Sequence, residues 1–483
     1  MKRYSLFIII TFSIGSLFFS GCEKEPENKG PAIEKADEIN TFIWNRLHDV
    51  YLWNKNVPEL TNTYYENNED SLNNFLNKYS DHEALFYDLL YEYGKTDKFS
   101  WIVDDYDVLE KEFQGISKSF GYNFMPASFD SNNVFAYVRY VVKGSPAALA
   151  GLKRGDYISK INGTQLTVQN YRDLLFSTES QSATLADIVD RTLIPNGRSV
   201  NMTAVEITEN PIYLDTVYTV NSQKIGYLIY NSFTSNFDIQ LNNVFQKFKN
   251  EGVSKLILDL RYNLGGSLES STYLASMIYG TQTNKVFLKT KFNDLMQNYY
   301  DQNYGANYFD VNFDSEISKG STKTPINTLN LSEVYIITSN HTASASESII
   351  NGLKPYMNVI TVGTRTLGKY VGSITVKDII DSKGTVNPNH KWAMQPIVLK
   401  VANSAGASDY VNGLAPQIEI SENVRNLSTL GDLNEPLLKA TVSTITGTTS
   451  KSAAIPDGVQ RLQIPDMERK SDMYFQQSGK FLK

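Results

Sequence analysis

One segment of the chain gathers hydroxyl side chains at a turn: residues 338–350 read TSNHTASASESII. A run of apolar residues ends at this segment, and alanines flank Ser344 on both sides. This order predicts a buried strand, a tight turn and a helix that begins at or beside Ser344. A helix N-terminus offers free backbone N–H groups and the positive end of the helix dipole, so Ser344 could be a nucleophile beside an oxyanion site. Because Ser344 and Glu347 also fit the capping-box pattern, plain helix capping is the competing interpretation.

A lysine follows the next predicted strand, in the sequence TRTLGKYVG at 364–372. The turn that holds Lys369 can therefore lie at the same sheet edge as Ser344. A partly buried lysine can lose its charge by desolvation, and Lys369 could then act as the general base for the serine. The alternative is an ordinary exposed lysine.

A third segment, DLRYNLGGS at 259–267, runs from a predicted buried strand into two glycines. Glycines allow the backbone to come close to a ligand and to point its N–H groups at it. A plain glycine turn is the competing interpretation.

Together these three segments resemble the C-terminal processing peptidases, the tail-specific serine proteases of the S41 family, which use a Ser-Lys dyad. The resemblance implies that Ser344 is the nucleophile, rather than Ser346 or Ser348, and that Lys369 is its base. The 25 residues from Ser344 to Lys369 equal the spacing that the family pattern leads one to expect. The element GLAPQI at 413–418 also matches the family.

The same resemblance implies an oxyanion site and a set of supporting residues, with no metal and no cofactor. The oxyanion would be held by the backbone N–H groups of Gly266 and Ala345. The residues at family-motif positions that would support the site are Arg261, Gly265, Glu347 and Thr366.

Two departures from the family pattern leave the third member of the site open. Many members have Gln four residues after the lysine, where this chain has Ser373, and others have an acid where it has Pro355. Ser373 is the residue that could still hydrogen-bond Lys369.

A second resemblance lies upstream, where short strands and tight turns replace helical periodicity. An apolar run at 135–142 is followed by GSPAALAGLKRGD at 144–156 and by YISKING at 157–163. Pro146 is expected to start a short helix and Gly151 to end it. This order resembles the PDZ domains of bacterial proteases, which implies a groove where a peptide C-terminus adds as a strand.

By the same resemblance, the loop that captures the peptide carboxylate should lie near Phe120–Phe124. A domain that merely braces the enzyme is the alternative.

The remaining pattern is α/β. Short apolar runs at 225–230, 255–260, 334–338 and 359–363 predict buried strands with helices between them. The resemblance implies a crotonase/ClpP-like β/α spiral catalytic domain, with the PDZ-like β domain inserted or preceding and a helical region at the N-terminus. The chain after Val424 is polar, with a Thr/Ser-rich stretch at 441–452, and predicts a partly disordered tail.

These observations predict six consecutive regions: a signal peptide at 1–21, a tether at 22–36, an N-terminal helical region at 37–110, a PDZ-like domain at 111–206, a peptidase domain at 207–425 and a C-terminal tail at 426–483.

The first residues predict export. A basic start, a largely apolar run at 6–19 and small residues before Cys22 are typical of a signal peptide. Cys22 is the only cysteine, so no disulfide can form within the chain. Its placement resembles a bacterial lipobox, although Phe19 stands where Leu is usual, and a chance cysteine is the alternative. The expected product is a lipoprotein of the cell envelope, held at the outer membrane on its periplasmic or surface face.

Composition adds two further limits. Hydrophobic residues make up 41% of the 483 residues and charged residues 20%, which is typical of globular domains. The net charge of -7 gives no reason to expect nucleic acid as a partner. Protein or peptide substrates with C-terminal tails are the expected partners, and the oligomeric state stays open.

Two rival functions remain. A Ser-His-Asp hydrolase could use His341, but no nucleophile-elbow pattern accompanies it. A non-catalytic peptide- or ligand-binding lipoprotein on the same fold is the other rival, and the unsettled third residue is its best support.

Overall fold

The computed structural model describes residues 34–61, 65, 67–176, 179–448, 457–462, 464 and 473–475. The predicted signal peptide, Cys22 and most of the predicted tether lie outside the described residues.

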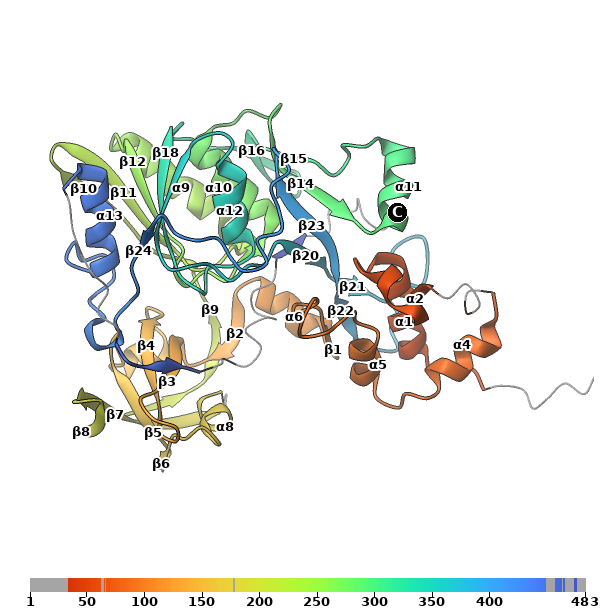
Figure 1. Cartoon of the computed structure of the whole chain (residues 1–483), viewed down its shortest axis with the longest axis horizontal. Helices are drawn as coiled ribbons and strands as arrows, with labels where there is room; N and C mark the ends of the chain where they lie inside the picture. Colours follow the sequence, from red (N-terminus) through yellow and green to blue (C-terminus); the bar gives the residue numbers. More distant parts are fainter. Residues whose placement is uncertain are drawn as a thin grey trace, which may run out of the picture.

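A six-stranded sheet forms the centre of the catalytic region (Figure 1). Its strands β11, β12, β18, β19 and β24 run parallel, and β10 is antiparallel to β11. The four apolar runs of the sequence form four of these strands, so their prediction is confirmed. In spatial order the strands are β10 (Ile212–Val220), β11 (Gln223–Tyr230), β12 (Lys255–Asp259), β18 (Glu333–Thr338), β19 (Asn358–Gly363) and β24 (Ile418–Glu419).

Helices cover both faces of this sheet, which explains why its strands are apolar on both sides. Leu258 and Ile336 face one core together with α9 (Asp238–Asn250), α10 (Leu268–Tyr279) and α12 (Ala345–Leu353). Their neighbours Ile257 and Ile337 face a second core, which α13 (Pro436–Thr446) closes. The sheet therefore determines where α12 begins, because the chain leaves the end of β18 and enters the helix after six intervening residues.

Helix α13 corrects the prediction of a partly disordered tail, which was wrong for Pro436–Thr446. Its Ser/Thr-rich sequence hides an apolar stripe, since Leu437 and Leu438 are buried against the sheet. The hydroxyl of Thr441 donates to the Leu437 carbonyl, so burial leaves no polar group of that side chain unsatisfied.

A second six-stranded sheet lies beside the ends of the first. It contains the last described residues of the chain as strand β26, again within the region predicted as a tail. In spatial order its strands are β13 (Gly266–Ser267), β26 (Met473–Phe475), β20 (Val371–Ile374), β23 (Ile397–Asn403), β14 (Val286–Phe292) and β15 (Val311–Asn312).

The N-terminal region is helical, as predicted, and packs on the catalytic region through strand pairing (Figure 1). Strand β1 (Trp101–Val103) pairs with β22 (Ala393–Gln395), which also pairs with β21 (Val376–Lys377). The region's helices are α1 (Glu38–Val50), η1 (Asn54–Asn56), α2 (Pro58–Thr61), α4 (Glu69–Leu76) and α5 (His82–Asp88), and α11 (Asp294–Tyr304) of the catalytic region contacts α1.

The PDZ-like domain has its own sheet and its own core, seen at the lower left of Figure 1. Ser145 caps the short helix α7 (Pro146–Leu149), and Gly151 follows it with a φ of 81°, so the predicted start and end are confirmed. In spatial order the strands are β25 (Gln460–Arg461), β3 (Tyr122–Ser128), β4 (Val134–Val141), β5 (Tyr157–Ile161), β7 (Ser180–Val189) and β8 (Thr192–Thr203), with β6 (Thr164–Gln165) paired to β5 and α8 (Tyr171–Leu175) packed beside them.

The two chain crossings into and out of this domain are paired with each other. Strand β2 (Ile116–Ser119), which follows α6 (Tyr106–Phe113), pairs antiparallel with β9 (Val205–Thr208). The domain is thus held at its base by a two-stranded neck. The other short elements are η2 (Ser235–Phe237), β16 (Glu316–Lys319), β17 (Thr322–Pro325) and η3 (Val424–Asn426).

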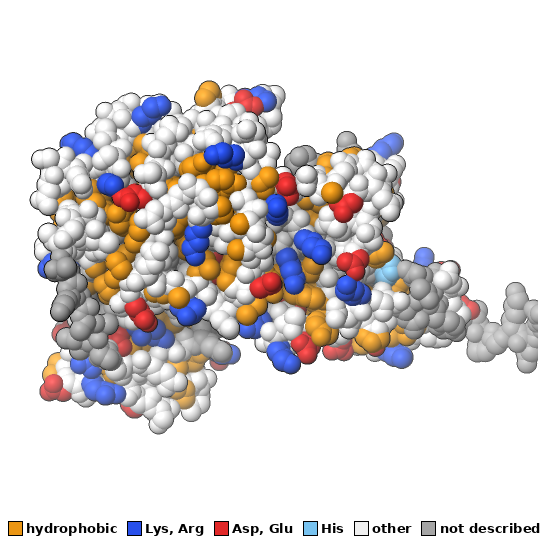
Figure 2. Space-filling model, turned by 45° about the horizontal axis from the view of Figure 1, so that its top comes forward, with side chains coloured by type: hydrophobic (Ala, Val, Ile, Leu, Met, Phe, Trp, Pro, Cys, Tyr) orange, Lys and Arg blue, Asp and Glu red, His pale blue; other side chains and the backbone are white. Residues whose placement is uncertain are grey.

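Three further observations concern surface charge, metal binding and membrane spans in the described part of the chain. Figure 2 shows acidic and basic side chains intermixed over one face, with apolar side chains between them. Within the described ranges, no group of three or more His, Cys, Asp or Glu side chains is placed to hold a metal ion. No helix in those ranges combines the length and the apolar character needed to cross a bilayer.

Candidate active site

Ser344 lies at the turn between β18 and α12, in an unusual backbone conformation. Its φ is 62° and its ψ is -115°, a region that residues with a side chain rarely adopt. The side chain is fully buried, and its Oγ has no hydrogen-bond partner among the described residues. A buried, unpaired hydroxyl costs about 1–3 kcal/mol, and backbone strain of this kind concentrates at functional sites. Both features favour a reactive serine over a capping serine.

The carboxylate of Glu347 joins the Ser344 turn to the Lys369 turn. Its Oε2 accepts the backbone N–H groups of Ser344 at 2.9 Å and Lys369 at 2.8 Å. Its Oε1 accepts the Thr366 hydroxyl at 2.6 Å and the Gly368 N–H at 2.8 Å. Four donors from two turns therefore converge on one buried side chain. The sequence indicated Glu347 and Thr366 only as supports, without this arrangement.

Burial controls the ionisation of this carboxylate. Desolvation raises the pKa of Glu347 to about 7, although the bonds from Thr366, Ser344, Lys369 and Gly368 each lower it. The group that holds the two turns together is thus expected to change its protonation near neutral pH.

Lys369 is completely buried, and an aromatic ring forms one wall around it. Its Nζ lies 4.6 Å from the centre of the Phe99 ring, close enough for a cation–π contact. Phe99 belongs to the N-terminal region, where its N–H donates to the buried carboxylate of Asp97. Phe99 was not predicted from the sequence, since its segment carries only helical periodicity and no motif.

Gly265 packs directly against the nucleophile, and Gly266 packs against Phe233 next to it. A Cβ added to Gly265, whose φ is 112°, would lie 2.7 Å from the Cβ and 3.1 Å from the Oγ of Ser344. A Cβ on Gly266, whose φ is 129°, would lie 2.4 Å from the Phe233 carbonyl oxygen. Only glycine fits at either position, so the backbone itself lines the site beside Ser344.

Gly266 and Ala345 are the residues whose N–H groups the sequence predicts as oxyanion donors. The Gly265 N–H is occupied, because it donates to the Asn263 side chain at 2.9 Å. Ala345 is the first residue of α12, where helices leave the backbone N–H without an intrahelical partner. The oxyanion roles of Gly266 and Ala345 stay predictions.

Arg261 connects the catalytic region to the PDZ-like domain through a buried network of ion pairs. Its buried guanidinium bonds Asp259 at 2.7 Å, Glu435 at 2.8 Å and Glu422 at 3.0 Å. Glu422 also accepts Arg154 of the PDZ-like domain at 2.7 Å. Burial raises the pKa of Glu422, but Arg154 and Arg261 outweigh it and hold this pKa well below the usual range. The network therefore keeps its charges at neutral pH.

Ser373 and His341 are the two other residues considered for a part in catalysis. The Ser373 hydroxyl donates to the Met473 carbonyl at 3.4 Å, and its predicted bond to Lys369 stays a prediction. His341 Nδ1 lies 2.8 Å from the Asn340 Oδ1, and burial together with Arg139 holds the His341 pKa well below its usual value. Because Ser344 Oγ bonds none of the described residues, His341 does not orient it.

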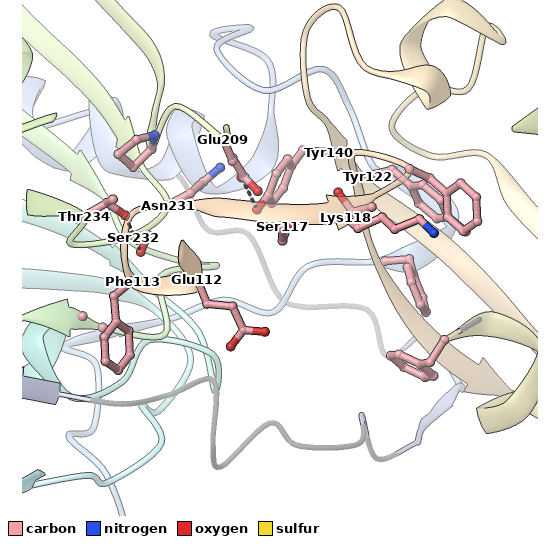
Figure 3. A pocket seen from close by; sticks show the side chains of 18 of the residues that line it. Glu112, Phe113, Ser117, Lys118, Tyr122, Tyr140, Glu209, Asn231, Ser232 and Thr234 are labelled. Atoms are coloured by element: carbon pink, nitrogen blue, oxygen red, sulfur yellow. Dashed lines mark hydrogen bonds between the residues drawn. The ribbon is translucent and has the colours of Figure 1, made fainter. Parts of the chain in front are cut away.

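A cavity of about 580 Å³ connects the PDZ-like domain to the two glycines. Figure 3 shows Tyr122 and Lys118 toward one end, Ser232 and Thr234 toward the other, and Ser117 between them. The predicted carboxylate loop contributes to this cavity. The wall residues from the PDZ-like domain include Phe120, Tyr122, Phe124, Leu175 and Phe176, and those from the catalytic region include Asn231, Gly265, Gly266 and Tyr474.

The raised pKa of Glu347 predicts a stability difference that depends on pH. An unfolded glutamate titrates near 4.5, below the folded value of about 7, so the unfolded chain releases its proton first. Wild type should lose stability as pH rises from about 4.5 to about 7, by about 3 kcal/mol in total. Glu347→Gln should lack this slope. The measurement is the free energy of unfolding in urea at pH 5 and pH 8. The difference between wild type and Glu347→Gln should fall by about 2 kcal/mol over this range. The same pH dependence in both proteins would contradict this ionisation.

Comparisons with known proteins agree with this arrangement. Residues 38–101 match the peptidase S41 N-terminal domain, 137–186 the PDZ domain and 224–420 peptidase family S41. A CtpA-like serine protease of Staphylococcus aureus (strain bovine RF122 / ET3-1) is 24% identical over 267 residues, which are 55% of this chain and 48% of that protein. Its counterpart in Staphylococcus saprophyticus is 24% identical over 252 residues, 52% of this chain and 45% of that protein. The chain thus matches about half the length of these relatives.

Similarity to a solved structure extends over most of the chain. An S41 protease structure from Bacteroides fragilis NCTC 9343 is 25% identical, with a TM-score of 0.62, over 84% of this chain and 97% of that one. The α/β fold with a PDZ domain and a helical N-terminal region is therefore shared with a known S41 structure. With its three matched domains in this order, the chain is a member of peptidase family S41 with a PDZ domain.

Proposed function

We propose that this protein is a serine endopeptidase of the C-terminal processing type, with Ser344 as nucleophile and Lys369 as general base. One observation carries the proposal: Glu347 bonds the backbone of both residues while the Ser344 hydroxyl stays buried and unpaired beside Gly265. Glu347 accepts the Ser344 N–H as in a capping box, but the Ser344 Oγ, which a capping serine would use, bonds none of the described residues.

The proposed reaction needs only groups at this site. Ser344 Oγ attacks the scissile carbonyl carbon while Lys369 Nζ, as the neutral amine, takes the hydroxyl proton. The N–H groups of Gly266 and Ala345 hold the resulting oxyanion. Lys369 then gives its proton to the leaving amine as the C–N bond breaks. A water molecule, deprotonated by Lys369, attacks the acyl-enzyme and releases the new carboxylate.

The cavity supports recruitment of substrates by their C-terminal tails. A peptide whose end adds to β3 could extend along the cavity from Tyr122 to Gly265 without leaving the protein surface. Aromatic side chains, among them Phe124 and Phe176, line the PDZ end of this path and favour apolar tails.

The dyad predicts two inactive single variants. Ser344→Ala and Lys369→Met should each slow cleavage of an unfolded protein with an apolar C-terminal tail by about 10²–10⁴-fold. The measurement is the rate of product appearance by gel or mass spectrometry, with circular dichroism to verify folding.

Two matched variants provide controls for the dyad. Ser254→Ala and Lys354→Met, both at exposed positions of the catalytic region, should stay within about threefold of wild type, because neither side chain belongs to the proposed dyad. Full activity of Lys369→Met would contradict the proposal. An inactive wild type, tested on several tails, would favour a tail-binding protein instead.

The PDZ-like domain predicts a split between binding and chemistry. Phe176→Asp places a charge in the apolar end of the cavity. A substrate tail would lose its contact with the aromatic ring, so the KM for tailed substrates should be about 10- to 100-fold higher. Turnover of a short peptide without such a tail should be unchanged. Leu149→Asp is the control, since that leucine is 82% exposed in the same domain. Equal KM for Phe176→Asp and wild type would contradict tail recognition here.

We also propose that Cys22, which lies outside the described residues, is acylated and holds the protein at the outer membrane. The lipobox-like placement of this single cysteine supports the proposal. Cells fed a palmitate analogue should label the wild type and not Cys22→Ser. Label in Cys22→Ser, or none in wild type, would refute the anchor.

A further inference from the structure

The chain's own C-terminal strand occupies the groove beside the proposed nucleophile. Strand β26 (Met473–Phe475) lies between β13 and β20 and runs parallel to both. Gly266 pairs with Met473 on one side, and Ser373 pairs with Tyr474 on the other.

The two flanking strands belong to the proposed catalytic machinery. β13 begins at Gly266, a predicted oxyanion residue, and β20 begins two residues after Lys369. A strand between them lies inside the sheet and does not add to its outer edge. Without β26, both strands would present unpaired backbone groups, which is the arrangement that accepts another strand.

The side chains of this strand fill two specific places. Met473 is completely buried, and its Sδ accepts the Ser348 hydroxyl of α12 at 3.4 Å. Tyr474 stacks on Phe113 with ring centres 4.0 Å apart, and its hydroxyl donates to the Phe113 carbonyl at 3.3 Å. Because Tyr474 also lines the cavity, it stands where a substrate from the PDZ-like domain would arrive.

A preceding part of the same C-terminal region pairs with a strand of the PDZ-like domain. Strand β25 (Gln460–Arg461) adds to the edge of β3, where Gln460 pairs with Ser128, and the Leu462 N–H donates to the Pro126 carbonyl at 2.9 Å. β3 is the strand to which a tail is proposed to add. The C-terminal region thus pairs with β3 and also with β13 and β20.

We propose that the groove between β13 and β20 is a binding site for one extended peptide strand with large apolar side chains, and that Met473–Phe475 holds it until a substrate strand displaces it. The inference rests on the proposed function, because it assigns the groove to substrates. The short pairing favours exchange, since each flank contributes only two residue pairs.

The first test measures binding without catalysis, in the Ser344→Ala background. The probe is a fluorescent peptide with the sequence KSDMYFQQS, which is residues 470–478. Adding Met473→Asp and Tyr474→Asp to the protein should expel β26 and tighten the apparent Kd of the probe by at least about tenfold, because the empty groove becomes the main state. A probe with Asp in place of its Met and Tyr should bind neither protein.

Tyr304→Asp in the same background is the matched control, since Tyr304 is 52% exposed and away from the groove. It should leave the probe affinity unchanged. An equal Kd for the Asp variant and its parent, or an equal gain in the control, would overturn the proposal.

A second measurement needs no change in β26, so it applies even where the Asp variant does not fold. Hydrogen exchange of the amides of Met473–Phe475 is followed in Ser344→Ala, alone and saturated with a tailed unfolded substrate. Displacement predicts at least about tenfold faster exchange in the complex. Unchanged or slower exchange at saturation would identify β26 as a permanent structural strand. Neither test depends on turnover, so a failed cleavage assay and a failed groove assignment remain distinguishable.

Discussion

The carboxylate of Glu347 is the interaction on which the rest of the site depends. It bonds the backbone N–H groups of Ser344 and Lys369 with the same oxygen, so two turns that are 25 residues apart share one anchor. Burial raises its pKa to about 7, even though the four donors that bond it lower the pKa. The parallel sheet brings the turns to one edge, and this carboxylate joins them there.

Three regions of the chain contribute to this one centre. The N-terminal region supplies Phe99 as a wall beside Lys369, and the PDZ-like domain reaches the base of the site through Arg154 and Glu422. The C-terminal region returns as β26, between strands that carry Gly266 and Ser373. Through these contacts the N-terminal region, the PDZ-like domain and the C-terminal region all pack around the catalytic region.

Periodicity and short motifs in the sequence were enough to predict the local elements of the fold. The buried strands, the turn at Ser344 and the limits of α7 depend on neighbouring residues alone. Phe99 could not be predicted, because a contact to Lys369 across 270 positions leaves no local signal. The prediction was wrong for α13, where the buried hydroxyl of Thr441 bonds within the helix, so that a stable element has the composition of a polar tail. Strand β26 also went unpredicted, since its pairing partners lie about 100 and 200 residues away.

The most direct measurement is the trapping of an acyl group from an activated peptide ester, located by mass spectrometry. A Ser-Lys dyad predicts acylation of Ser344 in the wild type, at a rate about 10²–10⁴-fold lower in Lys369→Met. Glu347→Gln should also be slower, since it loses acceptors that position both turns. Acylation of another residue, or an unchanged rate in Lys369→Met, would contradict the dyad.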